Sequence, residues 1–188
     1  MAGVREQIVS VARAMLARGL VTGTAGNVSA RHSRGMLLTP TRVHADDLTP
    51  ESLVELTLAG AVSGEGRPSL EWRLHAAIYE RRADVSAIVH THSPYAVARS
   101  FDTAPVVVDT QERSYLGLEQ IAVAPAVPAG SAELAEVAAA ALGTAPAVLL
   151  SRHGVVAVGA SPRDALELAS TVEQLAQIAL LVAGLTRS

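Results

Sequence analysis

The residues of this chain best suited to chemistry are three histidines. His90 and His92 flank one threonine in an extended segment, so both imidazoles point to the same side and can meet one ion. His153, which precedes a glycine in a distant segment, would complete a divalent site. Three neutral imidazoles leave a tetrahedral Zn²⁺ with one open position, as catalytic zinc sites require. The spacing therefore favours a catalytic metal site over a structural one.

An alternative interpretation makes these histidines ordinary hydrogen-bonded groups of a strand. The pair, however, ends an apolar strand predicted at Ser86–His90 and precedes a Ser-Pro step. Strand ends are where sites on α/β scaffolds usually lie, so the sequence favours metal binding. The remaining histidines have no such pairing, and a surface or helix-face position is favoured for His32, His44 and His75.

Glu71 is a further candidate, because it lies in the first turn of a predicted helix, where the macrodipole favours a carboxylate. It could be a fourth ligand to the metal, a general base or merely a first-turn charge, and the spacing leaves all three open. A base displaced from zinc by the substrate would be partly desolvated, which raises its pKa toward a useful range.

Two other segments look suited to an anion. The loop predicted at Thr22–Ser29 can offer backbone N–H groups, at Gly26 for example, and the Asn27 amide to phosphate oxygens. It matches neither a P-loop nor a dinucleotide fingerprint, so taken alone its favoured interpretation is a turn. Arg42, after Thr39-Pro-Thr41, offers a fork suited to phosphate or carboxylate. Ser69 could add a hydroxyl and its N–H at the helix N-terminus that carries Glu71.

Helical and strand periodicities alternate along the chain. Helices are predicted at 4–18, at 69–82 with Ser69 as the N-cap, at 93–100, at 131–142 and from Ser161-Pro162 to the end. Strands are predicted at 35–39, 53–58, 86–90, 106–108, 121–123, 147–150 and 155–158. This order indicates one α/β domain over residues 1–188, with helices covering a central sheet.

Composition narrows the class of protein. A chain of 188 residues suits one compact domain. Its formal charge of −3, with one Trp, three Tyr and one Phe, argues against a nucleic-acid partner. Because there is no cysteine, any metal must be held by imidazole and carboxylate, and the composition fits a cytoplasmic enzyme.

Hydropathy adds two expectations. The polar, amphipathic N-terminus is unlike a signal peptide. The apolar stretch 165–185 keeps Glu167 and Glu173, which favours a buried helix over a membrane span. Since 49% of the residues are hydrophobic, a partner subunit is expected to cover part of that surface, which predicts a homo-oligomer.

Six motifs together cover nearly the whole chain. In order they are Gly23-Thr-Ala-Gly-Asn-Val-Ser29, Leu38-Thr-Pro-Thr41, Asp47-Leu-Thr-Pro50, Pro68-Ser-Leu-Glu-Trp72, His90-Thr-His-Ser-Pro-Tyr95 and Arg152-His-Gly-Val-Val-Ala-Val-Gly159. The set resembles the class II aldolase/adducin family, and within it the branch of L-fuculose-1-phosphate aldolases, with the L-ribulose-5-phosphate 4-epimerases as a sister branch.

The resemblance implies a three-layer α/β/α domain around a mostly antiparallel sheet, and a homotetramer with active sites between subunits. It makes His90, His92 and His153 zinc ligands and Glu71 the catalytic acid/base. By motif match, the phosphate-binding positions become Gly26, Asn27, Thr41, Arg42, Ser69 and Leu70.

The implied reaction is retro-aldol cleavage of a small ketose phosphate to dihydroxyacetone phosphate and an aldehyde. In family aldolases zinc stabilises the enediolate left when the C–C bond breaks. A 4-epimerase or a decarboxylase could use the same chemistry, and adducin-like relatives keep the fold as a binding module without metal.

This sequence departs from the family pattern at several positions. The family's Ser-Gly is Thr41-Arg42, and its second serine before the glutamate is Leu70, so an arginine could take over the phosphate or the anion could be a carboxylate. The aldolase's tyrosine proton donor falls on Gln111, and the epimerase's aspartate on Arg113. Tyr115 or Glu112 could serve as the proton donor instead.

Overall fold

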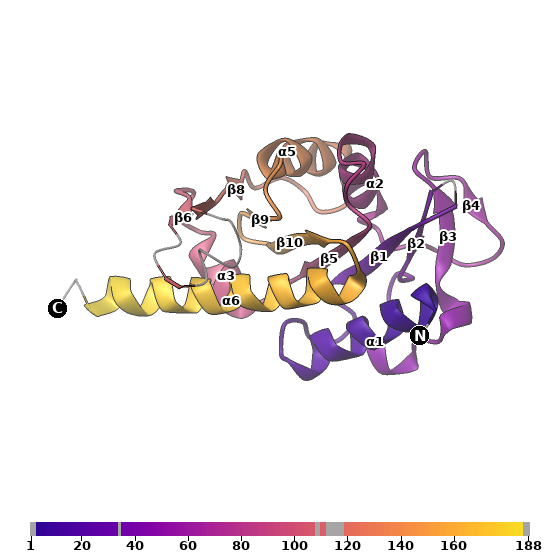
Figure 1. Cartoon of the computed structure of the whole chain (residues 1–188), viewed down its shortest axis with the longest axis horizontal. Coiled ribbons are helices and arrows are strands. Elements are labelled where there is room, and N and C mark those ends of the chain that lie inside the picture. Colours follow the sequence, from indigo (N-terminus) through magenta and orange to yellow (C-terminus); the bar gives the residue numbers. More distant parts are fainter. Residues whose placement is uncertain (1–2, 34, 108–109, 112–118, 186–188) are drawn as a thin grey trace.

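The structure is a computed structural model that describes residues 3–33, 35–107, 110–111 and 119–185 (Figure 1). Among these residues the main sheet has eight strands in the order β4-β3-β2-β1-β5-β10-β9-β8, and a separate pair joins β6 to β7. The strands are β1 (Asn27–His32), β2 (Gly35–Leu38), β3 (Val54–Thr57), β4 (Val62–Ser63), β5 (Ala87–Thr91), β6 (Val106–Val107), β7 (Gln120–Ile121), β8 (Val123–Ala124), β9 (Ala147–Leu150) and β10 (Gly154–Gly159).

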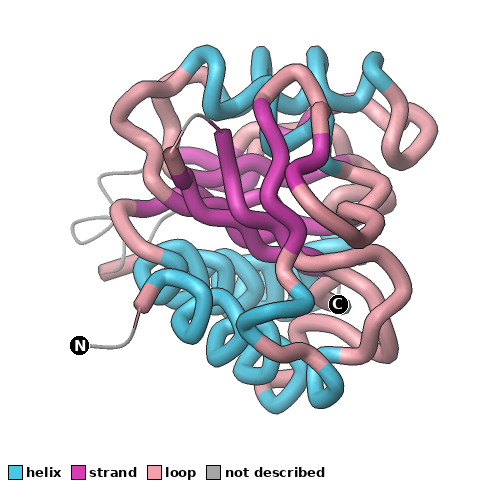
Figure 2. The backbone as a smooth tube through the Cα atoms, turned by 90° about the vertical axis from the view of Figure 1, so that its right-hand side faces the viewer, coloured by secondary structure: helices cyan, strands magenta, loops and turns pink. Residues whose placement is uncertain are grey.

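Helices cover both faces of the main sheet, which lies between them in Figure 2. The α-helices are α1 (Val4–Ala17), α2 (Trp72–Arg81), α3 (Pro94–Arg99), α5 (Ala132–Leu142) and α6 (Pro162–Leu185), and two 3₁₀ turns are η1 (Ala45–Asp47) and η2 (Pro50–Ser52). One apolar core joins α1, α3 and α6 to one face, and a second joins α2 and α5 to the other. Among the described strands of the main sheet, only β8 and β9 pair in parallel. The predicted three-layer α/β/α fold with a mostly antiparallel sheet is confirmed.

The central strand β5 explains how this sheet holds together. All five of its residues are buried, and it pairs antiparallel with β1 on one side and β10 on the other. A strand buried on both faces needs a continuous apolar run, which Ala87, Ile88 and Val89 supply. The polar residues that end the strand are therefore carried into the middle of the molecule.

Most predicted elements form at their expected places, and three differ. Asn27–Ser29, predicted as part of a loop, begins β1, because its residues pair with β5. The predicted 121–123 strand is split between β7 and β8, which pair with different partners. The helix predicted from Ser69 starts at Trp72, with Glu71 at the N-cap, because Pro68 pairs with Pro40 in an isolated bridge and a turn closed by the Trp72 N–H and the Ser69 carbonyl follows it.

Helix α6 has two unlike halves. Its first half packs against β10 and β5, with Ala169 and Val172 fully buried. Its second half runs past the sheet (Figure 1), and Leu181, Val182 and Leu185 are exposed there. The helix is long and apolar enough to cross a membrane by length and composition alone, a test that the core helix of a soluble protein also passes.

Candidate metal centre

Four predicted site residues converge at one point of the structure. One ligand atom from each of Glu71, His90, His92 and His153 lies within 4.8 Å of every other. His90 Nε2 is 3.1 Å from Glu71 Oε2 and 3.1 Å from His92 Nε2, and His153 Nε2 is 3.2 Å from Glu71 Oε1. Three imidazole nitrogens and one carboxylate are a donor set that fits a divalent cation such as Zn²⁺.

Strands β5 and β10 bring the histidines together. His90 lies in β5, and His92 follows its last residue. Because Val155 of β10 pairs with Thr91, the residue just before β10, His153, reaches the same end of the sheet. Gly154 is the point of closest approach, since a Cβ there would lie only 1.9 Å from the Thr91 carbonyl oxygen. Only glycine fits this contact without moving a strand.

The turn that carries His153 is held from α3. Arg152 has a left-handed backbone with φ of 60°, and its N–H donates to Ser100 Oγ at 2.8 Å. Ser151 Oγ donates to the Ser100 carbonyl at 3.0 Å. These two bonds fix a backbone conformation that L-residues rarely adopt, and they aim His153 at the other ligands.

The hydrogen bonds of His90 show what the cluster needs. Its Nδ1 lies 2.8 Å from the Val155 carbonyl, which can only accept, so Nδ1 carries the proton and a neutral ring has a lone pair on Nε2. That lone pair faces Glu71 Oε2, another acceptor. Glu71 Oε1 is also buried and accepts no hydrogen bond from the residues that the structure describes. The lone pairs of the imidazole nitrogen and of the carboxylate oxygens repel each other. A positive charge between them would remove this repulsion, and a divalent cation would supply that charge.

Burial and neighbouring charges shift the pKa values of the ionisable groups in the cluster. Burial alone would raise the pKa of the Glu71 carboxyl, but the neighbouring His90 and His153 outweigh it and hold that pKa below its usual range. Burial opposes protonation of His90, yet the Glu71 carboxylate raises its pKa overall. Burial, then the charges of His90 and His153, lower the pKa of His92 to about 4. At neutral pH His92 therefore offers an unprotonated nitrogen, and Glu71 a carboxylate.

An open cleft of about 240 Å³ lies in front of this cluster. Its lining includes Glu71, His92 and His153 together with every residue predicted to hold an anion, namely Gly26, Asn27, Thr41, Arg42, Ser69 and Leu70. His90 is fully buried behind them. The structure thus brings the candidate ligands and the candidate anion-binding residues into one site.

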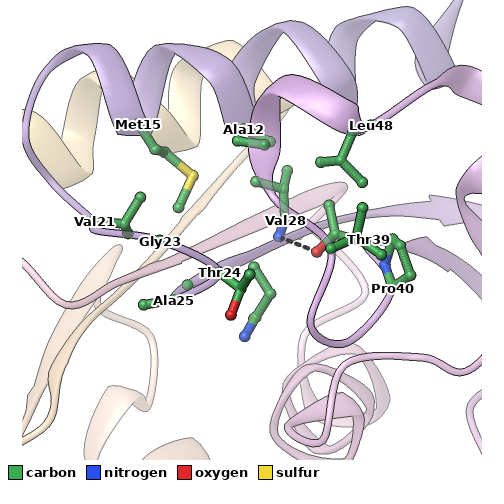
Figure 3. A pocket seen from close by; sticks show the side chains of 14 residues that line it. Ala12, Met15, Val21, Gly23, Thr24, Ala25, Val28, Thr39, Pro40 and Leu48 are labelled. Carbon is green, nitrogen blue, oxygen red and sulfur yellow. Dashed lines mark hydrogen bonds between the residues drawn. The ribbon is translucent and has the colours of Figure 1, made fainter.

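The glycine-rich loop forms one wall of the cleft and is anchored from behind. Figure 3 shows Met15 of α1 and Val21 beside this loop, with the Val28 N–H donating to Thr39 Oγ1 at 3.2 Å. A Cβ on Gly26, whose φ is 74°, would meet Val21 at 2.6 Å and the His90 carbonyl at 2.8 Å. Glycine is therefore required at position 26 for close packing behind the cleft.

The backbone sets what two anion-binding candidates can offer to a ligand. The Ser69 N–H is not free for a ligand, because it donates to the Thr39 carbonyl at 3.1 Å, and Ser69 Oγ accepts from the Glu71 N–H at 3.3 Å. Arg42 is exposed and has a left-handed backbone with φ of 59°. Such a conformation is strained for arginine and commonly marks a functional loop.

His75 lies on a face of helix α2, one of the two positions favoured for it, but not at the surface. It is fully buried, with Nε2 2.5 Å from Asn27 Oδ1 and Nδ1 2.7 Å from Ser29 Oγ. One signal for this was present, since His75 lies four residues after Glu71 and so on the same helix face. The proton-donor candidates Tyr115 and Glu112 lie outside the described residues, whereas Gln111 is exposed.

The fold and this cluster together define a member of a known class. The chain belongs to the class II aldolase and adducin family, since the model of the Class II Aldolase and Adducin N-terminal domain matches residues 6–180. With the aldolases that the chain resembles, this confirms the prediction of a class II aldolase, a carbon–carbon lyase.

Individual relatives agree with that assignment. The chain is 38% identical to an L-fuculose phosphate aldolase of Escherichia coli O6:H1 over 181 residues, which are 96% of this chain and 84% of that protein. It is 36% identical over 173 residues to a 5-methylthioribulose-1-phosphate/5-deoxyribulose-1-phosphate aldolase of Rhodospirillum rubrum, covering 92% and 78% of the two chains. The solved L-fuculose-1-phosphate aldolase from Thermus thermophilus superposes with a TM-score of 0.87 at 34% identity, covering 98% and 95%.

Proposed function

We propose that the protein is a zinc-dependent aldolase that cleaves a small ketose 1-phosphate, of the L-fuculose-1-phosphate type, to dihydroxyacetone phosphate and an aldehyde. The observation that carries the proposal is the convergence of Glu71, His90, His92 and His153 at the cleft, with one buried carboxylate oxygen that has no hydrogen bond within the described part of the chain. A divalent cation held by these residues would act as a Lewis acid toward the substrate carbonyl and stabilise the negative charge that develops there.

Glu71 is assigned the proton transfer at carbon. When the C–C bond breaks, its electron pair stays with the fragment that becomes dihydroxyacetone phosphate. The carbon atom of that fragment which carried the broken bond must then gain a proton. Glu71 is buried at the cleft next to the ligand nitrogens, so it can bind that proton and deliver it. A second group must accept the hydroxyl proton on the aldehyde side, and Tyr115 remains the candidate for that role.

The substrate's phosphate is assigned to the cleft wall beside Glu71. Gly26, Asn27 and Thr41 line that wall, with Arg42 and Ser69 alongside. Arginine forms paired, charge-assisted hydrogen bonds to phosphate or carboxylate. The exposed Leu70 adds an apolar contact at the same wall.

We further propose that residues 1–188 form one domain and that the protein works as a cytoplasmic homotetramer with active sites between subunits. The exposed apolar side chains of Leu181, Val182 and Leu185 support burial of the end of α6 against another subunit. Sedimentation of the purified protein tests the assembly, and a stable monomer would refute it.

A substrate panel tests the activity. Metal-free protein is reloaded with Zn²⁺ and incubated with L-fuculose 1-phosphate, 5-deoxyribulose 1-phosphate, 5-methylthioribulose 1-phosphate, L-ribulose 5-phosphate and a β-keto acid. Release of dihydroxyacetone phosphate from a ketose 1-phosphate supports the proposal. An epimer or CO₂ as the only product would replace it with a 4-epimerase or a decarboxylase, and no turnover together with no zinc binding would indicate a binding module.

The metal is tested separately from turnover. His92→Ala should lower the zinc content measured after reloading, because it removes one of three imidazoles. His44→Ala is the matched control, since His44 lies outside the cluster at the start of η1. Equal zinc content in both variants would refute His92 as a ligand.

A further inference from the structure

A row of four hydrogen bonds leads from Glu71 into the core. Asn27 Nδ2 donates to Glu71 Oε2 at 3.0 Å, and Asn27 Oδ1 lies 2.5 Å from His75 Nε2. His75 Nδ1 lies 2.7 Å from Ser29 Oγ, which in turn lies 2.8 Å from the Tyr79 hydroxyl. All five side chains are buried, and three of them, Ser29, His75 and Tyr79, are at most 2% exposed.

Two periodicities build this row. Asn27 and Ser29 are two residues apart on β1, so their side chains point to the same face of the sheet. Glu71, His75 and Tyr79 follow one another at four-residue spacing from the N-cap of α2, so they share one side of the helix. The packing of α2 on this face of the sheet interleaves the two sets.

The chemistry of the groups allows one direction for the hydrogen bonds. The Glu71 carboxylate can only accept, so the Asn27 NH₂ group must face it and the Asn27 carbonyl must face His75. His75 therefore carries its proton on Nε2, and the Nδ1 of the neutral ring accepts from the Ser29 hydroxyl. Ser29 then accepts from Tyr79. With a neutral His75 ring, all four hydrogen bonds of the row form together in this arrangement alone.

We propose that His75 is a positioning residue that holds the Asn27 amide so that one N–H is directed to Glu71 and the other to an anionic oxygen in the cleft. Asn27 lines the cleft beside Glu71, and an amide turned over would place its carbonyl against the carboxylate. His75 prevents that rotation because only the carbonyl can accept from its Nε2–H. The acid/base residue and the anion-binding wall are thereby linked through one side chain.

This inference rests on the proposed function, and three variants test it. His75→Leu removes the donor to Asn27. His75→Gln keeps a donor, since a glutamine amide can reach the place of the imidazole Nε2. Tyr79→Phe is the matched control, because it removes a buried hydroxyl from the same row while Ser29 can still donate to His75.

His75→Leu should lower kcat by about 10-fold to 100-fold, the usual effect of removing a group that orients a site residue. It should also raise the inhibition constant of inorganic phosphate, with zinc content unchanged. His75→Gln should recover most of the kcat and most of the affinity for inorganic phosphate. Tyr79→Phe should lower only the thermal stability. Equal loss of kcat in His75→Leu and Tyr79→Phe, or no recovery in His75→Gln, would mean that the row only stabilises the core.

A measurement without substrate separates this inference from the proposed function. In ¹⁵N-histidine NMR spectra at pH 7, His75 should show the Nε2–H tautomer with a proton that exchanges slowly with water. In Asn27→Ala, which lacks the accepting carbonyl, that proton should exchange faster. The Nδ1–H tautomer in the unaltered protein would overturn the inference, whereas failure of every sugar phosphate in the panel would overturn only the proposed function.

Discussion

Replacing Gly154 by alanine should weaken metal binding as well as destabilise the fold. Gly154 begins β10 and has an ordinary backbone conformation, so the effect of a methyl group there is steric. The new Cβ would lie 1.9 Å from the Thr91 carbonyl oxygen and 3.2 Å from His92 Cα. Both contacts are backbone atoms in the segment that carries two candidate ligands, so no flexible side chain can relieve them.

The expected loss of zinc affinity depends on how far the new methyl group displaces the backbone that carries the ligands. Real Cβ atoms essentially never approach closer than 3.0 Å, so the distance of 1.9 Å between this Cβ and the Thr91 oxygen must grow by at least 1.1 Å through a shift of backbone. Metal–ligand distances tolerate only about 0.2 Å. A misplacement of about 1 Å costs on the order of 100-fold in rate. We expect a similar loss of zinc affinity, with a destabilisation of about 1–3 kcal/mol from overpacking.

The measurement is competition for zinc against a chromophoric chelator, with thermal unfolding of the metal-free protein in parallel. Gly159→Ala is the matched control, because its Cβ would meet the Ala165 backbone nitrogen at 2.7 Å at the other end of β10. It should lose comparable stability and keep its zinc affinity. Unchanged affinity in Gly154→Ala, or equal losses in both variants, would show that the tight contact at Gly154 does not hold the ligands in place.

Glu71, Arg42 and His75 can each be tested by one substitution. Glu71→Gln should keep zinc and the fold but lower kcat by about 100-fold or more, because the amide cannot exchange a proton, and normal turnover would remove Glu71 from the mechanism. Arg42→Ala should raise KM for a phosphorylated substrate by about fivefold, as expected for an exposed charge pair, with little change for a neutral analogue; equal effects on both would argue against anion pairing. Burial, then the charge of His90, lowers the pKa of His75 to about 3 from 6.5. The unfolded chain therefore takes up a proton below pH 6.5 that the folded protein excludes. The stability that neutral His75 maintains is complete above pH 6.5 and falls on acidification. Between pH 7 and pH 5 the unaltered protein should lose about 2 kcal/mol more than His75→Gln in urea unfolding, and parallel losses would contradict a neutral buried His75.

Local sequence signals were sufficient for the family and for most elements. Alternation predicted that His90 and His92 share one side of a strand, and apolar spacing predicted α1. The helix predicted to begin at Ser131 forms as α5, and the Ser131 hydroxyl caps it by accepting from the Leu134 N–H at 3.0 Å. These features depend on residues only a few positions apart, whose geometry is set by the local backbone.

The features that the sequence did not predict depend on pairing between segments that are far apart in the chain. The strand β1 could not be recognised from its short, mixed sequence, because it is stabilised by pairing with β2 and β5. The same pairing buries Asn27 and Ser29 against α2 and places His75, which was expected at the surface or on a helix face, in the core. The hydrogen bond from the Ser69 N–H to the Thr39 carbonyl likewise depends on the pairing of two segments that are far apart in the sequence.

The sequence by itself determined the ligand types and the spacing of the His90–His92 pair, since both follow from residue chemistry and the two-residue repeat of a strand. The tertiary structure alone decided that Glu71 and His153 reach that pair, and that a buried carboxylate oxygen among the imidazoles has no hydrogen bond from any described residue. The physical reason is that bringing together residues separated by tens of positions depends on burial and strand pairing across the whole sheet, which no local pattern encodes.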